Sequence, residues 1–438
     1  MIDQDTAYMM VGASESIQLR IANTRFGSLT MKPNPPTHKT SSRRSPHPKA
    51  PAPAWIGIAI AFYAFITIGI AESGLGVLLP SILETFDLTP ATVTFLFISQ
   101  ISGYVLAAFS SSLISSRLGL APMLLVAAIT LTTAVATYGL ATAWFIMVAV
   151  GTLLGLGIGL IDAGINTYMV SDQQEAKWIG LLHAFYGIGA FLGPAIATTL
   201  LMLGLNWRQV YFVIASIVAL LIGAVAWIII TRYQPMMVRT AASNTHALAN
   251  LRFAIKTPIV LLSGLFLLVS VGTESSLGNW AYTVQHVSRN IPASTAGYSI
   301  SALWIGFTIG RLMLGVLVNR LGAIRLVNGS LAMLAVGLVS WCLLPGQWLS
   351  LPLIGFAISA IFPTTIWLMP QRVPTAVVPA AIGFVTSVAS LGAAIIPTAI
   401  GWIAARAGLE SIPVLILLLA VGMAVVHRGL TQQGTLSN

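Results

Sequence analysis

Twelve apolar stretches of about 20 residues dominate this sequence and restrict what it can fold into. A helix of that length crosses the roughly 30 Å hydrocarbon core of a bilayer, where every backbone polar group must be bonded within the chain. The sequence is 57% hydrophobic and 7% charged, against about 25% charged for soluble domains. It therefore predicts an all-α polytopic membrane protein. The predicted spans are 55–80, 93–114, 121–140, 143–169, 178–203, 210–230, 258–284, 296–318, 326–344, 349–369, 377–404 and 409–426.

Two of these stretches carry a glutamate within the same short phrase. Glu72 lies in I-G-I-A-E-S-G-L-G-V and Glu274 lies in V-G-T-E-S-S-L-G-N-W, 202 residues further on. An acid at the centre of a membrane helix costs about 2.5–3.5 kcal/mol on an insertion scale, so each glutamate should face a polar interior rather than lipid. The two acids therefore predict one cavity between the two halves of the chain.

Nearly the same spacing recurs along the rest of the sequence and predicts two six-helix repeats. A doubled membrane chain of this kind resembles the secondary transporters of the major facilitator superfamily, whose substrate site lies near the bilayer midplane between the halves. The resemblance implies the major facilitator fold. The matched pairs, each 203 residues apart, are Gly103 with Gly306, Arg117 with Arg320, Gly119 with Gly322, Gly180 with Gly383, Gly189 with Gly392 and Pro194 with Pro397.

The basic residues predict the orientation in the membrane. With both termini in the cytoplasm, nearly all Lys and Arg residues fall in the N-terminal tail or in loops on the inner side. The outer side carries only Arg208, Arg289 and Arg406, and Arg311 falls within a helix. Because inner loops collect positive charge, this arrangement favours cytoplasmic termini.

Composition divides the chain into five parts. Residues 1–54 are polar, basic and rich in Pro, Ser and Thr, with no apolar signal-peptide core, so we expect a disordered tail. Six-helix bundles are predicted at 55–231 and 258–428, joined by a basic cytoplasmic linker at 232–257. Residues 429–438 are the predicted C-terminal tail.

Three phrases give a closer resemblance, which covers the chain from residue 55 to about 428. They are G-I-G-L-I-D-A-G-I-N, L-H-A-F-Y-G-I-G-A-F-L-G-P and G-T-E-S-S-L-G-N-W. Together they are similar to the fucose:proton symporter branch of the superfamily and to its sodium-dependent glucose transporter relatives. In that branch an acid on the first helix and one on the fourth form the coupling pair. The resemblance places this pair at Glu72 and Asp162.

The residues themselves favour the same chemistry. A carboxyl in a low-dielectric cavity has its charged form disfavoured, so it can take up and release a proton as the cavity opens to either side. Glu274 and His183 are further candidates for coupling. A structural hydrogen bond to a neighbouring helix is the alternative for each acid, and His183 equally suits a packing role.

Sugar recognition would need a different set of side chains. Amides and hydroxyls bind the hydroxyl groups of the ring, and aromatic faces pack against its C–H surface. Trp280, Tyr282 and Trp304 also suit the aromatic belt at the membrane surface. The candidate substrate-binding residues are Gln100, Asn166, Tyr186, Asn279, Trp280, Tyr282, Thr364, Thr365 and Trp367.

The loops after the second and eighth spans resemble the superfamily motif G-x-x-x-D-R-x-G-x-R-R, a cytoplasmic latch between the halves. The first loop keeps only its first Arg and second Gly, whereas the second loop keeps more and has Asn in the Asp place. An Arg within the eighth helix is expected to snorkel to the surface or to pair with an acid at the gate. The predicted gate residues are Arg117, Gly119, Arg311, Asn319 and Arg320.

Together these features predict a secondary transporter that moves a small polar solute by proton- or sodium-coupled symport with alternating access. A monosaccharide is the solute that the sequence favours. A proton-coupled exporter of drugs or other amphiphiles, and a non-transporting membrane sensor, are the alternatives. Catalytic motifs and metal-ligand spacings are absent from the sequence, so neither an enzyme nor a cofactor is expected. We expect a monomer in a bacterial inner membrane. A nucleic-acid partner is not expected, because the basic residues form no patch with aromatic residues.

Overall fold

The computed structural model describes residues 55–171, 176–237, 247–344 and 350–435, which belong to one unit of the chain. Within these ranges twelve helical spans are long and apolar enough to cross a membrane, and no strand occurs. The twelve predicted spans and the all-α fold class are therefore confirmed. The predicted tail at 1–54 lies outside the described residues.

The first six spans are formed by seven helices, because the first span is interrupted. Within lipid, helices satisfy their own backbone hydrogen bonds, which explains why each apolar stretch is helical. The helices are α2 (Trp55–Ser73), α3 (Leu75–Thr85), α4 (Pro90–Leu118), α5 (Leu120–Leu140), α6 (Trp144–Ser171), α7 (Ala176–Met202) and α8 (Trp207–Thr231).

The remaining spans follow a short helix, α9 (Ala247–Ala254), which lies in the predicted linker. The last helix continues beyond the predicted boundary at 428, because Leu430 is buried against the bundle. The helices are α10 (Pro258–Thr283), which ends in a π-helical turn (Val284–Ser288), then α11 (Ala293–Leu321), α12 (Ala323–Leu343), α13 (Ser350–Ser359), α14 (Ile361–Leu368), α15 (Val378–Ala407) and α16 (Ser411–Thr435).

The repeat is visible in matching turns of the two halves. Gly119 ends α4 and precedes α5 with φ 92°, and Gly322 ends α11 and precedes α12 with φ 79°. Glycine adopts such positive φ values without the steric penalty of a Cβ. The halves differ at the glutamate phrase, where α2 breaks at Gly74 while α10 continues through Ser276, the residue at the equivalent position.

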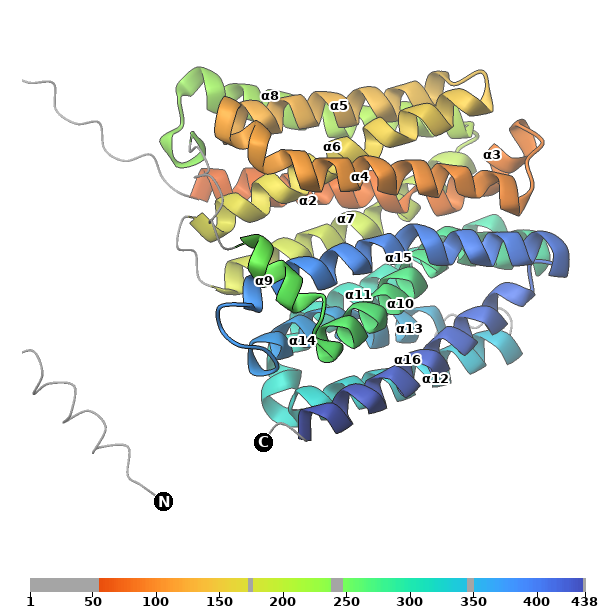
Figure 1. Ribbon diagram of the computed structural model, residues 1–438. Helices are drawn as coiled ribbons and strands as arrows, with labels where there is room; N and C mark the ends of the chain where they lie inside the picture. The colour runs from red at the N-terminus through yellow and green to blue at the C-terminus, as the bar shows by residue number, and fades with distance from the viewer. Residues whose placement is uncertain (1–54, 172–175, 238–246, 345–349, 436–438) are drawn as a thin grey trace, which may run out of the picture. The chain divides into compact units, whose positions relative to one another are not determined.

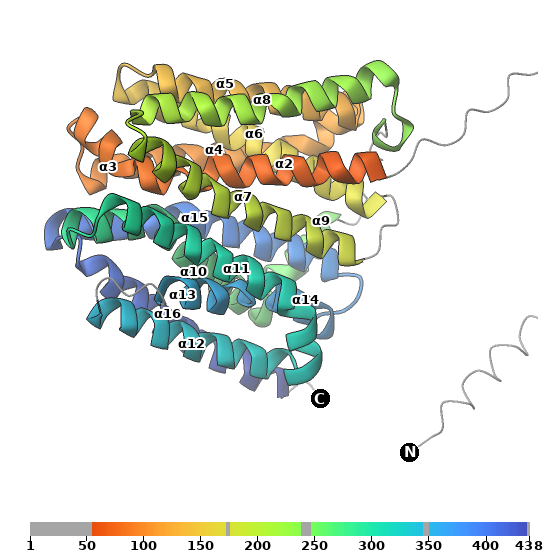
Figure 2. The ribbon, with the colours of Figure 1, turned by 180° about the vertical axis from the view of Figure 1, so that it is seen from behind.

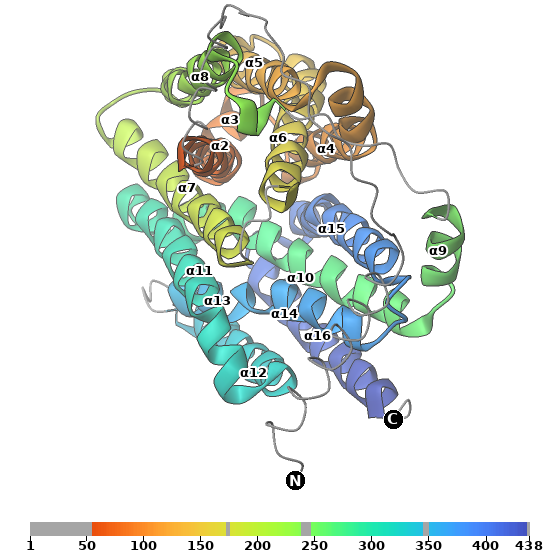
Figure 3. The ribbon, with the colours of Figure 1, turned by 90° about the vertical axis from the view of Figure 1, so that its left-hand side faces the viewer.

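Each half packs around its own pairs of helices, and the halves meet along three seams. In the first half α4 packs on α6 and α2 on α7, and in the second half α10 packs on α15 and α11 on α13. The seams join α7 to α11, α4 to α15 and α3 to α10. Figure 1 and Figure 2 show the two groups of helices from opposite sides. Figure 3 shows them nearly end-on, with α7 beside α11 and α6 facing α15.

We name the two ends of the bundle by one basic residue each. Arg117 lies where α4 and α11 end, and Arg289 lies at the opposite end. Two hydrogen bonds between the halves lie at the Arg289 end. Trp402 Nε1 donates to Thr94 Oγ1 at 3.1 Å, and the hydroxyls of Thr199 and Tyr298 are 3.0 Å apart. In this structure polar bonds hold the halves together at the Arg289 end.

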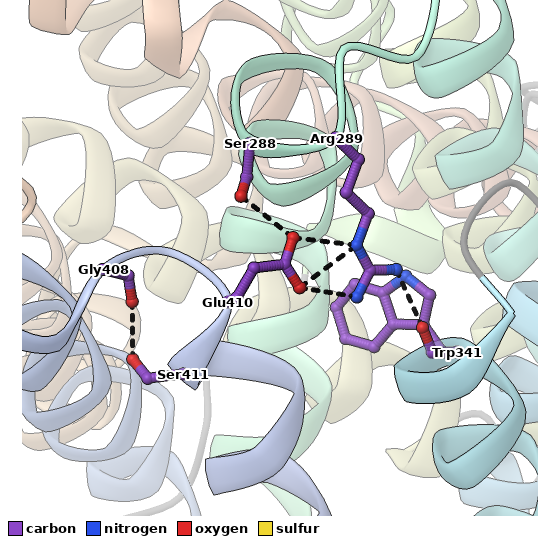
Figure 4. A network of polar contacts seen from close by, with 6 residues as sticks. All are labelled: Ser288, Arg289, Trp341, Gly408, Glu410 and Ser411. Atoms are coloured by element: carbon purple, nitrogen blue, oxygen red, sulfur yellow. Dashed lines mark hydrogen bonds and ion pairs between the residues drawn. The ribbon is translucent and has the colours of Figure 1, made fainter.

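A network around Arg289 ties three helix ends of the second half together (Figure 4). Arg289 Nε and Nη2 donate to the two carboxylate oxygens of Glu410 at 2.9 and 2.8 Å. Arg289 Nη1 donates to the Trp341 carbonyl at 2.8 Å, and Ser288 Oγ donates to Glu410 at 2.9 Å. The Arg289 side chain is 8% exposed and the Glu410 side chain 53%. The network links the end of α10 to the end of α12 and the start of α16.

Glu410→Gln is expected to lower the stability of the protein at neutral pH by about 0.5–1 kcal/mol, because half-exposed ion pairs contribute little more than that. The hydrogen bonds from Arg289 hold the pKa of Glu410 below its ordinary value of 4.5. A lowered pKa means that the contribution is complete above pH 4.5 and is lost as the pH falls through the lowered value. Thermal unfolding in detergent should show the difference between parent and variant at pH 7 and its loss in acid. An equal difference at both pH values would contradict this prediction.

Candidate functional site

A cavity of about 310 Å³ lies between the two halves. Its walls come from α2, α4, α6 and α7 of the first half and from α10, α11, α14 and α15 of the second. Ligand pockets in proteins begin at about 300 Å³, so the volume suits a small solute. Three carboxyl groups, those of Glu72, Asp162 and Glu274, face this one space.

Both cavity acids of the first half are held by tyrosine hydroxyls. Tyr104 OH donates to Asp162 Oδ2 at 2.6 Å, and Asn166 Nδ2 donates to Asp162 Oδ1 at 2.8 Å. Tyr186 OH donates to Glu72 Oε2 at 3.0 Å. Hydrogen bonds to a charged group contribute about 1.5–3 kcal/mol each, so these donors fix the position of both carboxylates. Each acid therefore has a donor from a different helix.

Close packing of α4 on α6 explains why Tyr104 reaches Asp162. A Cβ on Gly155 would meet the backbone carbonyl of Gln100, and a Cβ on Gly103 would meet that of Thr152. Small residues allow membrane helices to approach closely, and here each of the two helices contributes one glycine that lies against the backbone of the other. The short distance between the helix axes brings the Tyr104 hydroxyl to the carboxylate on α6.

The second half contributes a carboxylate and a guanidinium. Glu274 and Asn279 lie on α10, and Arg311 lies on α11. The Arg311 guanidinium packs over the Phe307 ring, 4.6 Å from its centroid, and its Nε is buried without a hydrogen bond. The charges of Arg311 and Glu274 attract each other. The structure thus places Arg311 in the cavity rather than at the predicted gate, because its α11 position faces the centre of the bundle.

Most of the predicted coupling and polar binding residues come together in this cavity. Asn166 does not line the cavity but contacts Asp162. The lining includes Glu72, Asp162, Glu274, His183, Gln100, Tyr186 and Asn279.

The two predicted aromatic binding residues on α10 lie outside this lining. Trp280 is fully buried, and its Nε1 donates to the Pro397 carbonyl at 3.1 Å. Its ring meets Phe97 edge-on across the boundary between the halves. Tyr282 lines a separate space of about 100 Å³ beside Thr198. Trp280 therefore packs against α15 and α4, where substrate has no access in this conformation.

The three candidates on α14 also lie outside the cavity lining. Thr364 is buried, and Thr365 Oγ1 donates to the Ile361 carbonyl within the same helix at 2.8 Å. The Trp367 side chain is 54% exposed on the outer surface of the bundle. The residue that α14 contributes to the cavity is Phe362. The helix therefore presents an apolar face where the sequence predicted hydroxyls.

Sequence reasoning missed several cavity residues. Tyr104 was missed because its contact with Asp162 depends on which helix packs against the fourth span, and no local pattern reports that. Trp304 was not among the predicted binding residues, because it also suits the aromatic belt at the membrane surface, but it lines the cavity and is 5% exposed. The neighbouring Gly103, which takes part in the repeat, was the available signal for Tyr104. The other aromatic lining residues that were missed are Phe65, Phe97 and Phe362.

The predicted gate residues lie at the Arg117 end. Arg117, Asn319 and Arg320 are exposed, and Gly119 forms the turn between α4 and α5. Among the described residues, neither Arg117 nor Arg320 forms a salt bridge. Their role in a latch between the halves stays a prediction.

A sequence profile of the Major Facilitator Superfamily matches residues 61–397. The chain belongs to this superfamily, and its twelve apolar spans make it a multi-pass membrane protein.

Two relatives share part of the sequence. "Bypass of stop codon protein 6" of Saccharomyces cerevisiae is 24% identical over 262 residues, which cover 55% of this chain and 52% of that protein. "Glucose/mannose transporter GlcP" of Bacillus subtilis is 24% identical over 166 residues, which cover 38% of this chain and 41% of that protein. The matches thus span about half or less of the length of each relative.

Solved transporters share the fold over nearly their whole length. The nucleoside transporter NupG has a TM-score of 0.69 at 14% identity, with 86% of this chain and 98% of that chain covered. FucP, solved in an outward conformation, has a TM-score of 0.59 at 14% identity, with 85% and 98% covered. The resemblance to the sugar symporter branch predicted from the three sequence phrases is confirmed at the level of family and fold.

Proposed function

We propose that this protein is a monosaccharide symporter driven by protons, which works by alternating access of the central cavity. The observation that carries the proposal is the meeting of Glu72, Asp162 and Glu274 in one cavity between the halves. Buried acids in membrane spans are costly and mark ion or substrate pathways. The partial match to a glucose/mannose transporter supports a sugar as the solute.

The lining has the chemistry that a small hydroxylated ring needs. Gln100 and Asn279 offer amides, and Phe65, Phe97 and Trp304 offer aromatic faces. An exporter of amphiphiles would be served better by a wide cavity with flexible methionines. The described residues of the lining include no methionine, and the volume lies at the small end of the range for ligand pockets. Both features favour the monosaccharide over the amphiphile.

The partners of the cavity acids favour the proton over the sodium ion. Tyr104, Asn166 and Tyr186 all donate hydrogen bonds to the carboxylates of Asp162 and Glu72. A sodium ion needs oxygen atoms that direct lone pairs toward it, and these donors occupy lone pairs of both carboxylates. We infer that these acids carry protons and that no further cofactor takes part.

The charge pattern supports a placement in the membrane. We propose that the Arg117 end faces the cytoplasm of a bacterial cell and that the protein works as a monomer in the inner membrane. The Arg117 end carries most of the basic loop residues, as the positive-inside rule requires. In this orientation the bonds between the halves close the outer side.

Counterflow of radiolabelled monosaccharides into proteoliposomes tests the proposed function. The purified protein is expected to exchange at least one hexose without an ion gradient and to accumulate that hexose when a pH gradient is applied. A sodium gradient of equal size at constant pH is the control and should produce no accumulation. Absence of exchange for every monosaccharide, together with binding of a lipophilic cation, would replace the symporter with the exporter.

A disulfide between α7 and α11 at the Arg289 end is expected to block exchange. A Cβ on Gly297 would come within 2.9 Å of the Thr198 Cβ, so the two helices need to separate by only about 0.6 Å to reach the roughly 3.5 Å at which disulfides begin to fit. Gly297→Cys with Thr198→Cys, in a protein whose single Cys342 is replaced by Ser, should crosslink on oxidation and lose most of its counterflow. Reduction should restore the counterflow, because the halves can then separate at this end.

The single variants Gly297→Cys and Thr198→Cys are the controls, and oxidation should leave their exchange unchanged. Full exchange by the oxidised and crosslinked protein would show that the Arg289 end need not open, and alternating access about this seam would be wrong.

A further inference from the structure

We propose that Arg311 binds an anionic group of the substrate, so that the cavity takes a monosaccharide with a carboxylate, a hexuronate or a similar sugar acid, together with one proton. This inference rests on the proposed sugar transport and defines the substrate class more closely. Its basis is the contrast between the partnered acids of the first half and the unpartnered charges of the second.

Arg311 is the one Lys or Arg among the described residues of the lining. Its guanidinium packs over the Phe307 ring, which fixes the plane of the group, and its Nε has no hydrogen-bond partner. A buried charge without hydrogen bonds is destabilising by several kcal/mol. The guanidinium presents paired donors that fit the two oxygens of a carboxylate. A ligand carboxylate would therefore supply the hydrogen-bond acceptors that the protein does not provide for the Arg311 guanidinium.

The acids of the cavity do not accept hydrogen bonds from Arg311. Asp162 and Glu72 accept hydrogen bonds from tyrosines on neighbouring helices of their own half. Glu274 attracts Arg311 electrostatically, but the one salt bridge among the described residues is that between Arg289 and Glu410. Glu274 and Arg311 thus face the same cavity without forming a salt bridge, so the donors of the guanidinium remain open to a ligand group.

Charge balance then couples the sugar acid to a proton. A ligand carboxylate that pairs with Arg311 neutralises the one guanidinium facing Glu72, Asp162 and Glu274, so these three acids together take up one proton from the side at which the ligand entered. After the halves move, the ligand leaves and the proton follows, so one anion and one proton cross with no net charge. The titratable groups that face Glu274 in the cavity are Glu72 of α2, Tyr104 of α4, Asp162 of α6, His183 and Tyr186 of α7, and Arg311 of α11.

Transport of a neutral hexose would give a different result. Its hydroxyl groups can accept hydrogen bonds from Arg311 without bringing a negative charge next to Glu274. In that case transport would carry one net charge for each proton. Matched ligands separate the two cases, since glucuronate and glucose, or galacturonate and galactose, differ only at carbon 6. Competition for counterflow measures relative affinity, and uptake at a clamped membrane potential measures the charge that moves.

We expect the uronate to compete more strongly than its hexose in the parent protein. Arg311→Gln should weaken uronate competition about 10- to 100-fold, the size expected for charge-assisted hydrogen bonds, and change hexose competition by less than about threefold. Arg311→Lys should retain part of the preference because it retains the charge. Arg406→Gln, which removes an exposed arginine at the end of α15, is the matched control and should behave as the parent does.

Uronate uptake should follow the pH gradient and be insensitive to a potential set by potassium and valinomycin. Hexose exchange with no uronate competition would overturn the inference and leave the proposed function standing. Equal loss of uronate and hexose competition in Arg311→Gln would do the same. A parent protein that exchanges none of the four sugars would overturn the proposed function as well.

Discussion

Glu72→Gln and Asp162→Asn are each expected to abolish accumulation of sugar against its gradient while leaving counterflow intact. With one proton per sugar, a gradient of one pH unit can drive about tenfold accumulation, because a factor of ten corresponds to 1.36 kcal/mol. Each variant should bring that ratio to about one. The amides keep the size and polarity of the carboxyl groups, so the cavity keeps its shape and still binds the solute.

The two acids should differ in how strongly counterflow is affected. Asp162 accepts bonds from both Tyr104 and Asn166, and therefore also holds α4 against α6. Glu72 accepts a single bond from Tyr186. Asp162→Asn should consequently reduce the thermal stability of the protein in detergent more than Glu72→Gln does. Measuring unfolding beside transport separates this structural effect from the loss of coupling.

Glu84→Gln is the matched control, because Glu84 is exposed at the end of α3 and far from the cavity lining. It should accumulate sugar as the parent does. If Glu72→Gln and Asp162→Asn lose counterflow and accumulation in parallel with their stability, the acids serve only as structural hydrogen-bond partners, and the coupling role is wrong.

The fold could be predicted from the sequence because the membrane leaves few solutions for twelve apolar stretches. The repeat of Gly119 at Gly322 was visible in the sequence, and both glycines make the same turn in the structure. Glu72 and Glu274 could also be placed in one cavity, since an acid in a membrane span must avoid lipid, and the resemblance placed Asp162 with Glu72 as a coupling pair. These predictions depend on energetic penalties large enough to exclude alternatives.

The details of the cavity wall could not be predicted in the same way. Trp280 was expected to stack on substrate, but α15 offers its indole a carbonyl at Pro397, and the ring is buried there. Arg311 was expected at the gate, but Phe307 supports its guanidinium within the cavity. Which face of a helix meets which neighbour depends on packing between segments far apart in the chain, and an apolar sequence with weak amphipathicity does not report it.

The second large effect is expected from a substitution at the seam between α3 and α10. Gly76→Val should shift the protein away from the conformation in which the halves meet at the Arg289 end. A Cβ on Gly76 would run into the backbone carbonyl of Gly278, and backbone atoms cannot move aside as a flexible side chain does. Overpacking of this kind costs about 1–3 kcal/mol. Because the cost falls only on the closed seam, the population should shift by about 5- to 150-fold.

Thr198 on α7 and Gly297 on α11 lie in the neighbouring seam at the same Arg289 end, so the rate of disulfide formation between Gly297→Cys and Thr198→Cys reports how often the halves meet at this end. Adding Gly76→Val should slow the crosslinking by the same factor and reduce counterflow, since each transport cycle must pass through the closed seam. Gly422→Val is the control, because no heavy atom lies within 4 Å of a Cβ at Gly422. An elution profile that matches the parent shows that Gly76→Val has folded. Unchanged crosslinking by such a folded variant would mean that close approach of α3 to α10 does not control the seam.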